Sequence, residues 1–162
     1  MQIHTQLVQW YLENKRELPF RKNQDPYRVW ISEIMAQQTQ IDTLIPYYER
    51  WMNRFPNLDE LSVADDEELY RLWEGLGYYS RVKNIKKAAQ MIEHDFNKTF
   101  PTSKQDIEKL PGIGDYTSSA IASICFNEKT AAIDGNVKRV MSRLFTLEES
   151  DDKKYFYNFV KN

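Results

Sequence analysis

A turn flanked by glycines and a carboxylate downstream of it are the features of this sequence that most readily support a reaction. Gly112 and Gly114 allow the backbone to approach a bulky partner closely. A helix should open near Asp115, and its first amides have no partner within the helix, so this turn is suited to binding a phosphate. Asp134 precedes a second expected helix, where it can cap the helix and place a carboxylate beside the bound group. This combination indicates chemistry on a nucleic acid.

Glu33 is a second candidate for chemistry because its neighbours on a helix would be largely apolar. Residues three and four positions away include Val29, Trp30 and Ala36. A carboxyl group in such surroundings is harder to ionise, which suits a general acid. The alternative is an ordinary surface glutamate on an amphipathic helix. The amide-rich run 37–40 favours the first interpretation, since amide side chains can read base edges or fill a gap in a base stack.

Glu33 and Asp134 together match the needs of N-glycosidic bond cleavage. This reaction uses an acid at the leaving base and a negative group near the positive charge that develops on the sugar, as glycoside hydrolysis does. A capping aspartate is held rigidly, so helix capping and stabilisation of a transition state are compatible roles for Asp134. We predict that these two residues are the catalytic carboxylates.

Length and composition fit a globular chain with a real core. The sequence has 162 residues and is 41% hydrophobic, which suits one domain, or one domain with part of another. Cys125 is the single cysteine and cannot by itself supply a disulfide, a zinc site or an iron–sulfur site, so we predict a packing role for it and no metal site. No apolar run is long enough to span a bilayer and no signal peptide is evident, so we expect a cytoplasmic protein with no membrane partner.

The charge is unevenly distributed along the chain. A net charge of −2 and a pI near 5.8 argue against a protein that holds nucleic acid by bulk electrostatics. The basic residues nevertheless gather in two groups, one with Arg81, Lys83, Lys86 and Lys87, the other with Lys138, Arg139 and Arg143. Solvated helix faces are one interpretation. Their occurrence on a chain with the glycine turn favours a surface that contacts phosphates.

The remaining pattern predicts short helices and no strand. Expected helix starts are Asp25 before Pro26, Ser80, and two potential capping boxes, Ser62 with Asp65 and Ser103 with Asp106. A helix is expected around residues 7–12, another over 44–55, and a final apolar one over 155–160. The chain is therefore expected to be all-α, with about eight or nine short helices joined by short loops.

These features together resemble the helix-hairpin-helix DNA glycosylases and, more narrowly, the adenine DNA glycosylases of the MutY type. The resemblance runs in order through residues 18–21, 25–27, 32–40, 73–81, 110–114 and 134–140. It implies a six-helix barrel domain over residues 21–131, with the helix-hairpin-helix at about 104–125. Residues 1–20 and 132–162 would be parts of a second helical domain, truncated before an iron–sulfur loop.

The resemblance also implies roles for the candidate residues. Glu33 would protonate adenine at N7, and Asp134 would stabilise the oxocarbenium ion or bond transiently to the sugar, with support from Tyr116 and Asn136. Gln38 and Tyr78 would enter the duplex when the adenine is flipped out. The full set of implied DNA-binding residues is Gln38, Thr39, Tyr78, Arg81, Gly112, Gly114, Thr117, Lys138 and Arg139. The adenine pocket would be lined by Arg16, Phe20, Arg21 and Trp30, with Phe20 in place of the usual tryptophan.

The implied activity is that of a monofunctional DNA glycosylase in base excision repair. It would hydrolyse the N-glycosidic bond of adenine mispaired with 8-oxoguanine or guanine, acting as a monomer on double-stranded DNA in the bacterial cytoplasm, at the nucleoid. Tyr116 stands where the endonuclease III type has a lysine that forms a Schiff base. Full-length members usually carry a [4Fe-4S] cluster, whose cysteines are absent from this chain. The alternatives are an endonuclease III-like bifunctional glycosylase and lyase, and a non-catalytic helix-hairpin-helix module that binds DNA.

Overall fold

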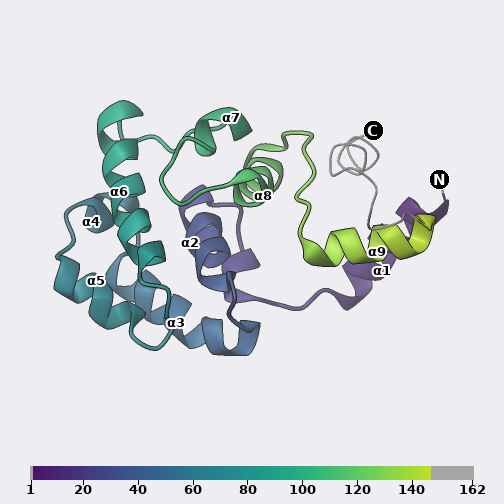
Figure 1. Cartoon of the computed structure of the whole chain (residues 1–162), viewed down its shortest axis with the longest axis horizontal. Coiled ribbons are helices and arrows are strands. Elements are labelled where there is room, and N and C mark those ends of the chain that lie inside the picture. Colours follow the sequence, from purple (N-terminus) through teal and green to yellow (C-terminus); the bar gives the residue numbers. More distant parts are fainter. Residues whose placement is uncertain (1, 147–162) are drawn as a thin grey trace.

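The computed structural model describes residues 2–146, and within this range it contains helices and no strand (Figure 1). In chain order the elements are α1 (Gln2–Asn14), the 3-10 helix η1 (Pro19–Arg21), α2 (Pro26–Ala36), α3 (Ile41–Arg54), α4 (Leu58–Ser62), α5 (Asp66–Trp73), α6 (Ser80–Asp95), α7 (Lys104–Ile107), α8 (Asp115–Phe126) and α9 (Gly135–Phe145). The all-α prediction is confirmed. The helix expected over residues 155–160 lies outside the described residues.

Two helix starts follow from the predicted capping residues. The side chain of Asp25 accepts a hydrogen bond from the amide of Arg28, and Pro26 is the first residue of α2. Ser103 Oγ accepts a hydrogen bond from the amide of Asp106 at 3.1 Å, at the start of α7. The start of α2, which carries Glu33, and the start of α7 are therefore each determined by residues within three positions in the sequence.

The predicted capping box between Ser62 and Asp65 is wrong. Ser62 is the last residue of α4, and its hydroxyl donates to the carbonyl of Asp59. Asp65 caps α5 by itself, because its carboxylate accepts from the amides of Glu67 and Glu68. The sequence pattern missed α4 because a helix of five residues is too short to show an apolar period.

The helix α2 is central to the main body and packs against η1, α3 and α8. Trp51 of α3 and Trp73 of α5 are fully buried, and their rings meet edge to face with centroids 5.7 Å apart. Trp51 Nε1 donates to the hydroxyl of Tyr27, which donates to the carbonyl of Phe55. The first turn of α2 is thereby tied to the core, which fixes the position of Glu33 two turns later.

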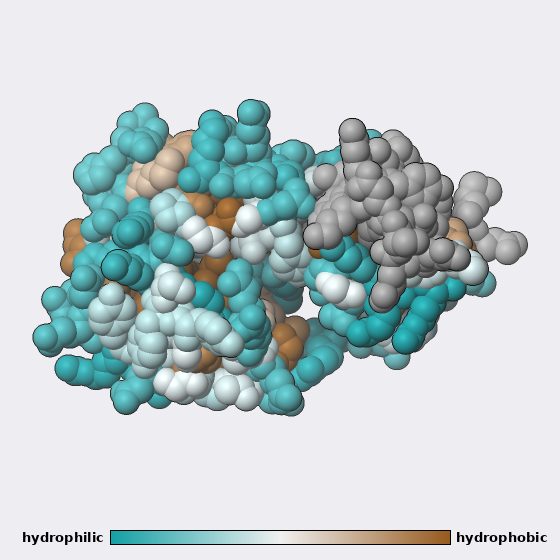
Figure 2. Space-filling view, in the orientation of Figure 1, coloured by the Kyte–Doolittle hydropathy of each residue, from teal (hydrophilic) through white to brown (hydrophobic). Residues whose placement is uncertain are grey.

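The helices α1 and α9 lie at the far end of the molecule's long axis from α5 and α6 (Figure 1). The large apolar side chains of α1 are exposed, namely Ile3, Leu7, Val8, Trp10, Tyr11 and Leu12. In the main body, hydrophilic side chains surround small apolar areas (Figure 2). The division into a barrel over 21–131 and a second domain stays a prediction. Within residues 2–146, no helix is both long enough and apolar enough to cross a bilayer.

Candidate active site

Glu33 lies on the buried face of α2 and forms an ion pair with Arg21. The residue is 7% exposed, so the alternative of an ordinary surface glutamate is wrong. Arg21 Nη2 donates to Glu33 Oε1 at 2.5 Å. The turn of η1 brings Arg21 there, since its amide donates to the carbonyl of Leu18 and its guanidinium lies 5.6 Å from the centre of the Phe20 ring. A charge-assisted bond thus fixes one oxygen of the buried carboxylate.

Tyr116, in the first turn of α8, shares its surroundings with both predicted carboxylates. Burial, together with the negative charges of Glu33 and Asp134, raises the pKa of its phenol to about 12, whereas the charge of Arg21 opposes the shift. The interaction of the Tyr116 phenol with Glu33 acts on the pKa in the same direction as burial. The phenol is therefore neutral at physiological pH, and the structure brings these four side chains into one electrostatic environment.

Asp134 caps α9, as predicted, and both of its oxygens are oriented. Its Oδ1 accepts from the amide of Val137 at 2.7 Å, and its Oδ2 accepts from Asn136 Nδ2 at 3.1 Å. Asn136 Oδ1 in turn accepts from Arg139 Nη2 at 2.9 Å. The carboxylate is half-buried and held in one direction by the amide of Val137 and by the side chain of Asn136, which Arg139 holds in turn; this suits a group that must face a developing positive charge.

The predicted hairpin joins α7 to α8 and depends on Gly112. Its φ of +79° lies in the left-handed region, and a Cβ atom there would come within 2.8 Å of Asn84 Cβ. Gly114 precedes α8 without a side-chain cap, so the amides of the first turn have no intrahelical acceptor. Lys104 braces this turn by pairing with Asp115 at 2.8 Å. The sequence did not reveal this ion pair because the two residues lie on different helices.

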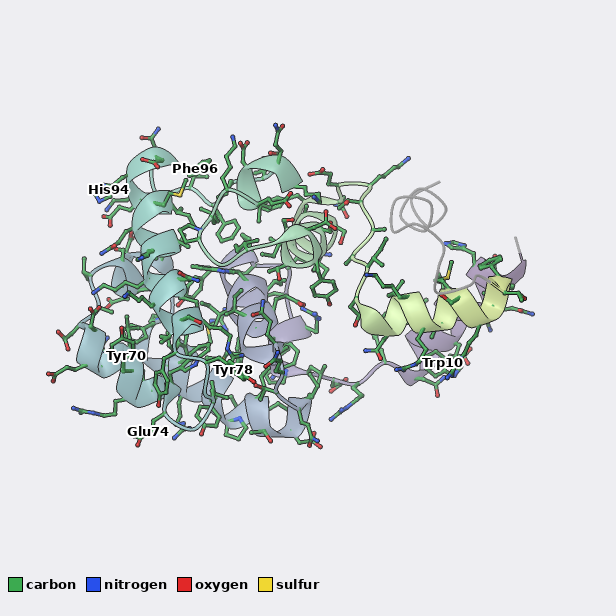
Figure 3. All side chains as sticks on the ribbon, viewed as in Figure 1. Trp10, Tyr70, Glu74, Tyr78, His94 and Phe96 are labelled. Atoms are coloured by element: carbon green, nitrogen blue, oxygen red, sulfur yellow. The ribbon has the colours of Figure 1, made fainter. Side chains whose placement is uncertain are left out.

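Gln38 and Tyr78 occupy two turns with the same unusual backbone. Their φ values are +58° and +48°, in the left-handed region that non-glycine residues rarely adopt. Both side chains are exposed, that of Tyr78 to 66%, whereas Thr39 is half-buried. Tyr78 lies in the turn before α6 (Figure 3). A backbone of this kind persists only where its surroundings hold it and is common at functional sites, which fits two exposed side chains that enter a base stack.

The structure places three further predicted residues away from the ion pair of Glu33 with Arg21. Thr117 is 3% exposed, so only its backbone amide faces the start of α8. Trp30 is fully buried, packs against the ring of Phe100, and lines a cavity of about 200 Å³. Arg16 pairs with Asp42 at 2.8 Å on the surface. None of these three side chains forms a hydrogen bond or an ion pair with Glu33 among the described residues, where Arg21 pairs with it.

The prediction for Arg81 needs the largest revision. Its side chain is 9% exposed, and its guanidinium donates to backbone carbonyls instead of facing solvent. Phe20 is likewise buried, with its ring 5.5 Å from that of Tyr48. Lys138 and Arg139 follow Asp134 on α9, where Arg139 donates to Asn136. Direct contact of Lys138 and Arg139 with DNA stays a prediction.

The fold is that of known DNA glycosylases. A thermostable thymine-DNA glycosylase superposes with a TM-score of 0.87 at 22% identity, covering 97% of this chain and 74% of that one. Endonuclease III in a non-covalent complex with DNA superposes with a TM-score of 0.82 at 21% identity, covering 98% and 75%. At such identities the likeness concerns the fold alone.

Comparison of the amino-acid sequence identifies the superfamily within this fold class. Over residues 31–162 the chain matches the HhH-GPD superfamily of base excision DNA repair proteins, and it belongs to that superfamily. An adenine DNA glycosylase of Buchnera aphidicola (subsp. Baizongia pistaciae) is 46% identical over 142 residues, which cover 87% of this chain and 40% of the relative. The adenine DNA glycosylase of Rattus norvegicus is 43% identical over 147 residues, covering 85% and 28%. The chain thus spans less than half the length of these relatives.

Proposed function

We propose that the full-length protein is a monofunctional adenine DNA glycosylase. It hydrolyses the N-glycosidic bond of adenine mispaired with 8-oxoguanine or guanine during base excision repair. The observation that carries this proposal is the buried Glu33, fixed by Arg21 and sharing its surroundings with Tyr116 and Asp134. The names of the relatives that are 43% and 46% identical support adenine as the base.

In the proposed reaction, Glu33 takes up a proton in the complex with DNA and donates it to N7 of the flipped adenine. The bond between C1′ and N9 then breaks, and its electron pair leaves with the base. The carboxylate of Asp134, oriented by Asn136 and the amide of Val137, stabilises the positive charge on the sugar. Water adds to C1′ and gives up a proton to Glu33, which leaves an abasic site and free adenine.

Tyr116 makes a lyase step unfavourable. A Schiff base needs an amine nucleophile, and a phenol cannot form one. Because the pKa of Tyr116 is raised to about 12, the phenol stays neutral and serves as a hydrogen-bond donor. The monofunctional reaction is therefore favoured over the bifunctional alternative.

The proposed partner is a DNA duplex bound by a single protein chain. Phosphates meet the free amides of the first turn of α8 at Gly114, and Gln38 and Tyr78 fill the space that the flipped adenine leaves. Gly112 permits the close approach of the backbone. Lys138 and Arg139 extend this surface along α9.

An iron–sulfur cluster does not fit the residues of this chain. Such a cluster is held by four cysteine thiolates, and the sequence contains only Cys125. This residue is half-buried in α8, and burial raises the pKa of its thiol to about 11, which disfavours the thiolate. No step of the proposed reaction involves a cluster.

The proposal is tested by incubating the full-length protein with duplexes that place adenine opposite 8-oxoguanine, guanine or thymine. We expect release of free adenine from the first two and little from the third, with no DNA adduct trapped by borohydride. A covalent adduct would establish the bifunctional reaction instead. Binding to all three duplexes without release of adenine would favour the non-catalytic module.

A further inference from the structure

Arg81, at the start of α6, donates five hydrogen bonds to backbone carbonyls outside its own helix. Its Nη1 donates to the carbonyls of Ile34, Met35 and Gln37 at 3.0, 3.3 and 2.6 Å, and its Nη2 donates to those of Leu76 and Gly77 at 2.9 and 3.2 Å. The acceptors belong to two segments that lie about 40 residues apart in the sequence, the end of α2 and the turn before α6. One guanidinium therefore joins two loops.

Two of the five contacted carbonyls stand directly before Gln38 and Tyr78, whose φ values are positive. The carbonyl of Gln37 precedes Gln38, and that of Gly77 precedes Tyr78. A left-handed backbone is unfavourable for a residue with a Cβ atom, so each turn persists only when its surroundings hold it. Arg81 stabilises each turn by donating a hydrogen bond to the carbonyl of the peptide unit that precedes the strained residue.

The ring contacts of Arg81 add a second connection. Its guanidinium carbon lies 5.2 Å from the centre of the Trp73 ring, which is fully buried, and 5.7 Å from that of Tyr78, which is 66% exposed. The guanidinium thus links an exposed aromatic ring to the core. Lysine could not replace it, because an ammonium group has three donors and no planar face.

We propose that Arg81 is a positioning residue that sets the spacing of the Gln38 and Tyr78 turns, so that both side chains enter the duplex together. This inference rests on the proposed function, in which these two residues fill the space left by the flipped base. Arg81 itself does not touch the DNA. Its charge instead acts on the peptide dipoles that shape the two turns.

The test compares Arg81→Lys with the wild type and with Arg71→Lys, which makes the same change at an exposed arginine of α5. A duplex with 2-aminopurine beside the adenine opposite 8-oxoguanine reports base flipping by fluorescence. For Arg81→Lys we expect a smaller fluorescence rise and a single-turnover rate lower by about 10- to 100-fold, since small misplacements cost this much. The Kd for undamaged duplex should change by less than about twofold, because phosphate contacts dominate it.

A double-substitution series separates positioning from general damage to the fold. In a Gln38→Ala/Tyr78→Ala background, Arg81→Lys should slow excision little further, because the side chains that it positions are gone. A further loss as large as in the wild-type background would overturn the inference, as would unchanged flipping in folded Arg81→Lys. Absence of flipping and excision in the wild type would instead refute the proposed function.

Should Arg81→Lys unfold at the assay temperature, the comparison is repeated at a lower temperature where circular dichroism matches the wild type. Amide hydrogen exchange gives an independent readout there. We expect faster exchange in residues 37–40 and 76–79 with unchanged exchange in α3 and α8. Uniformly faster exchange across all helices would contradict a positioning role, since it would indicate a global loss of stability.

Discussion

Replacing Arg21 by methionine should destabilise the protein by leaving the carboxylate of Glu33 without its cation. Within the described residues, Glu33 forms an ion pair with Arg21, and the carboxylate is 7% exposed. Methionine keeps an unbranched chain of similar length, so the change removes mainly the charge and its donors. The free energy of unfolding should therefore fall because a buried charge becomes unpaired.

The size of this effect follows from the exposure of the two partners. Breaking a fully buried ion pair costs about 3–5 kcal/mol, whereas exposed pairs contribute about 0.2–1 kcal/mol. The side chain of Arg21 is 34% exposed, so water screens the pair in part. We expect Arg21→Met to lower the free energy of unfolding by about 2 kcal/mol.

Urea unfolding at pH 7 of Arg21→Met, Glu33→Gln and the double variant measures the interaction energy between Arg21 and Glu33. Glu33→Gln removes the charge that Arg21 neutralises, so the double variant should be more stable than Arg21→Met alone by about 1 kcal/mol. Arg71→Met serves as the control at an exposed arginine and should change the stability by less than about 0.5 kcal/mol. Simple additivity of the two single effects would refute the reasoning.

Three further perturbations address the hairpin, the cap and the phenol. Gly112→Ala should lower the free energy of unfolding in urea by about 2–4 kcal/mol, because φ at Gly112 is positive and Asn84 is close. Gly114→Ala adds a methyl group with no atom near it and should lower this free energy by less than about 0.5 kcal/mol. Asp134→Asn should keep the cap and the stability but lose adenine release, and Asp134→Ala should in addition cost about 1 kcal/mol in thermal unfolding. The pKa of Tyr116 is raised to about 12, so its contribution to stability is complete below about pH 10, the usual tyrosine pKa. This contribution is lost as the pH rises towards about 12. Tyr116→Phe should therefore remove this part of the loss of stability at alkaline pH, measured by unfolding at a series of pH values.

Features set by neighbouring residues could be predicted from the sequence. The caps at Asp25 and Asp134 involve amides three residues away, so the residue types alone identify them. The apolar helical neighbours of Glu33 left a buried acid and a surface glutamate both open, and the structure shows that Glu33 is buried. The family was identified because six short blocks occur in a fixed order, and membership in the superfamily is confirmed.

Features set by distant residues could not be predicted in this way. Arg81 reads as one member of a basic group, yet its acceptors lie in segments that only the folded chain brings together. Thr117 sits beside the hairpin in sequence but points into the core. The short helix α4 is not evident in the sequence, because a helix of five residues shows no apolar period. Tertiary packing decides each of these cases.

The single-turnover rate of adenine release by Glu33→Gln tests the central claim most directly. The assay uses the full-length protein in excess over a duplex with adenine opposite 8-oxoguanine, and Glu49→Gln, at an exposed position of α3, is the matched control. Glutamine keeps the shape of Glu33 but cannot donate a proton as an acid, so we expect a rate at least about 100-fold lower than that of the wild type. The control should release adenine at the wild-type rate. Release by Glu33→Gln at the wild-type rate would contradict the assignment of Glu33 as the acid.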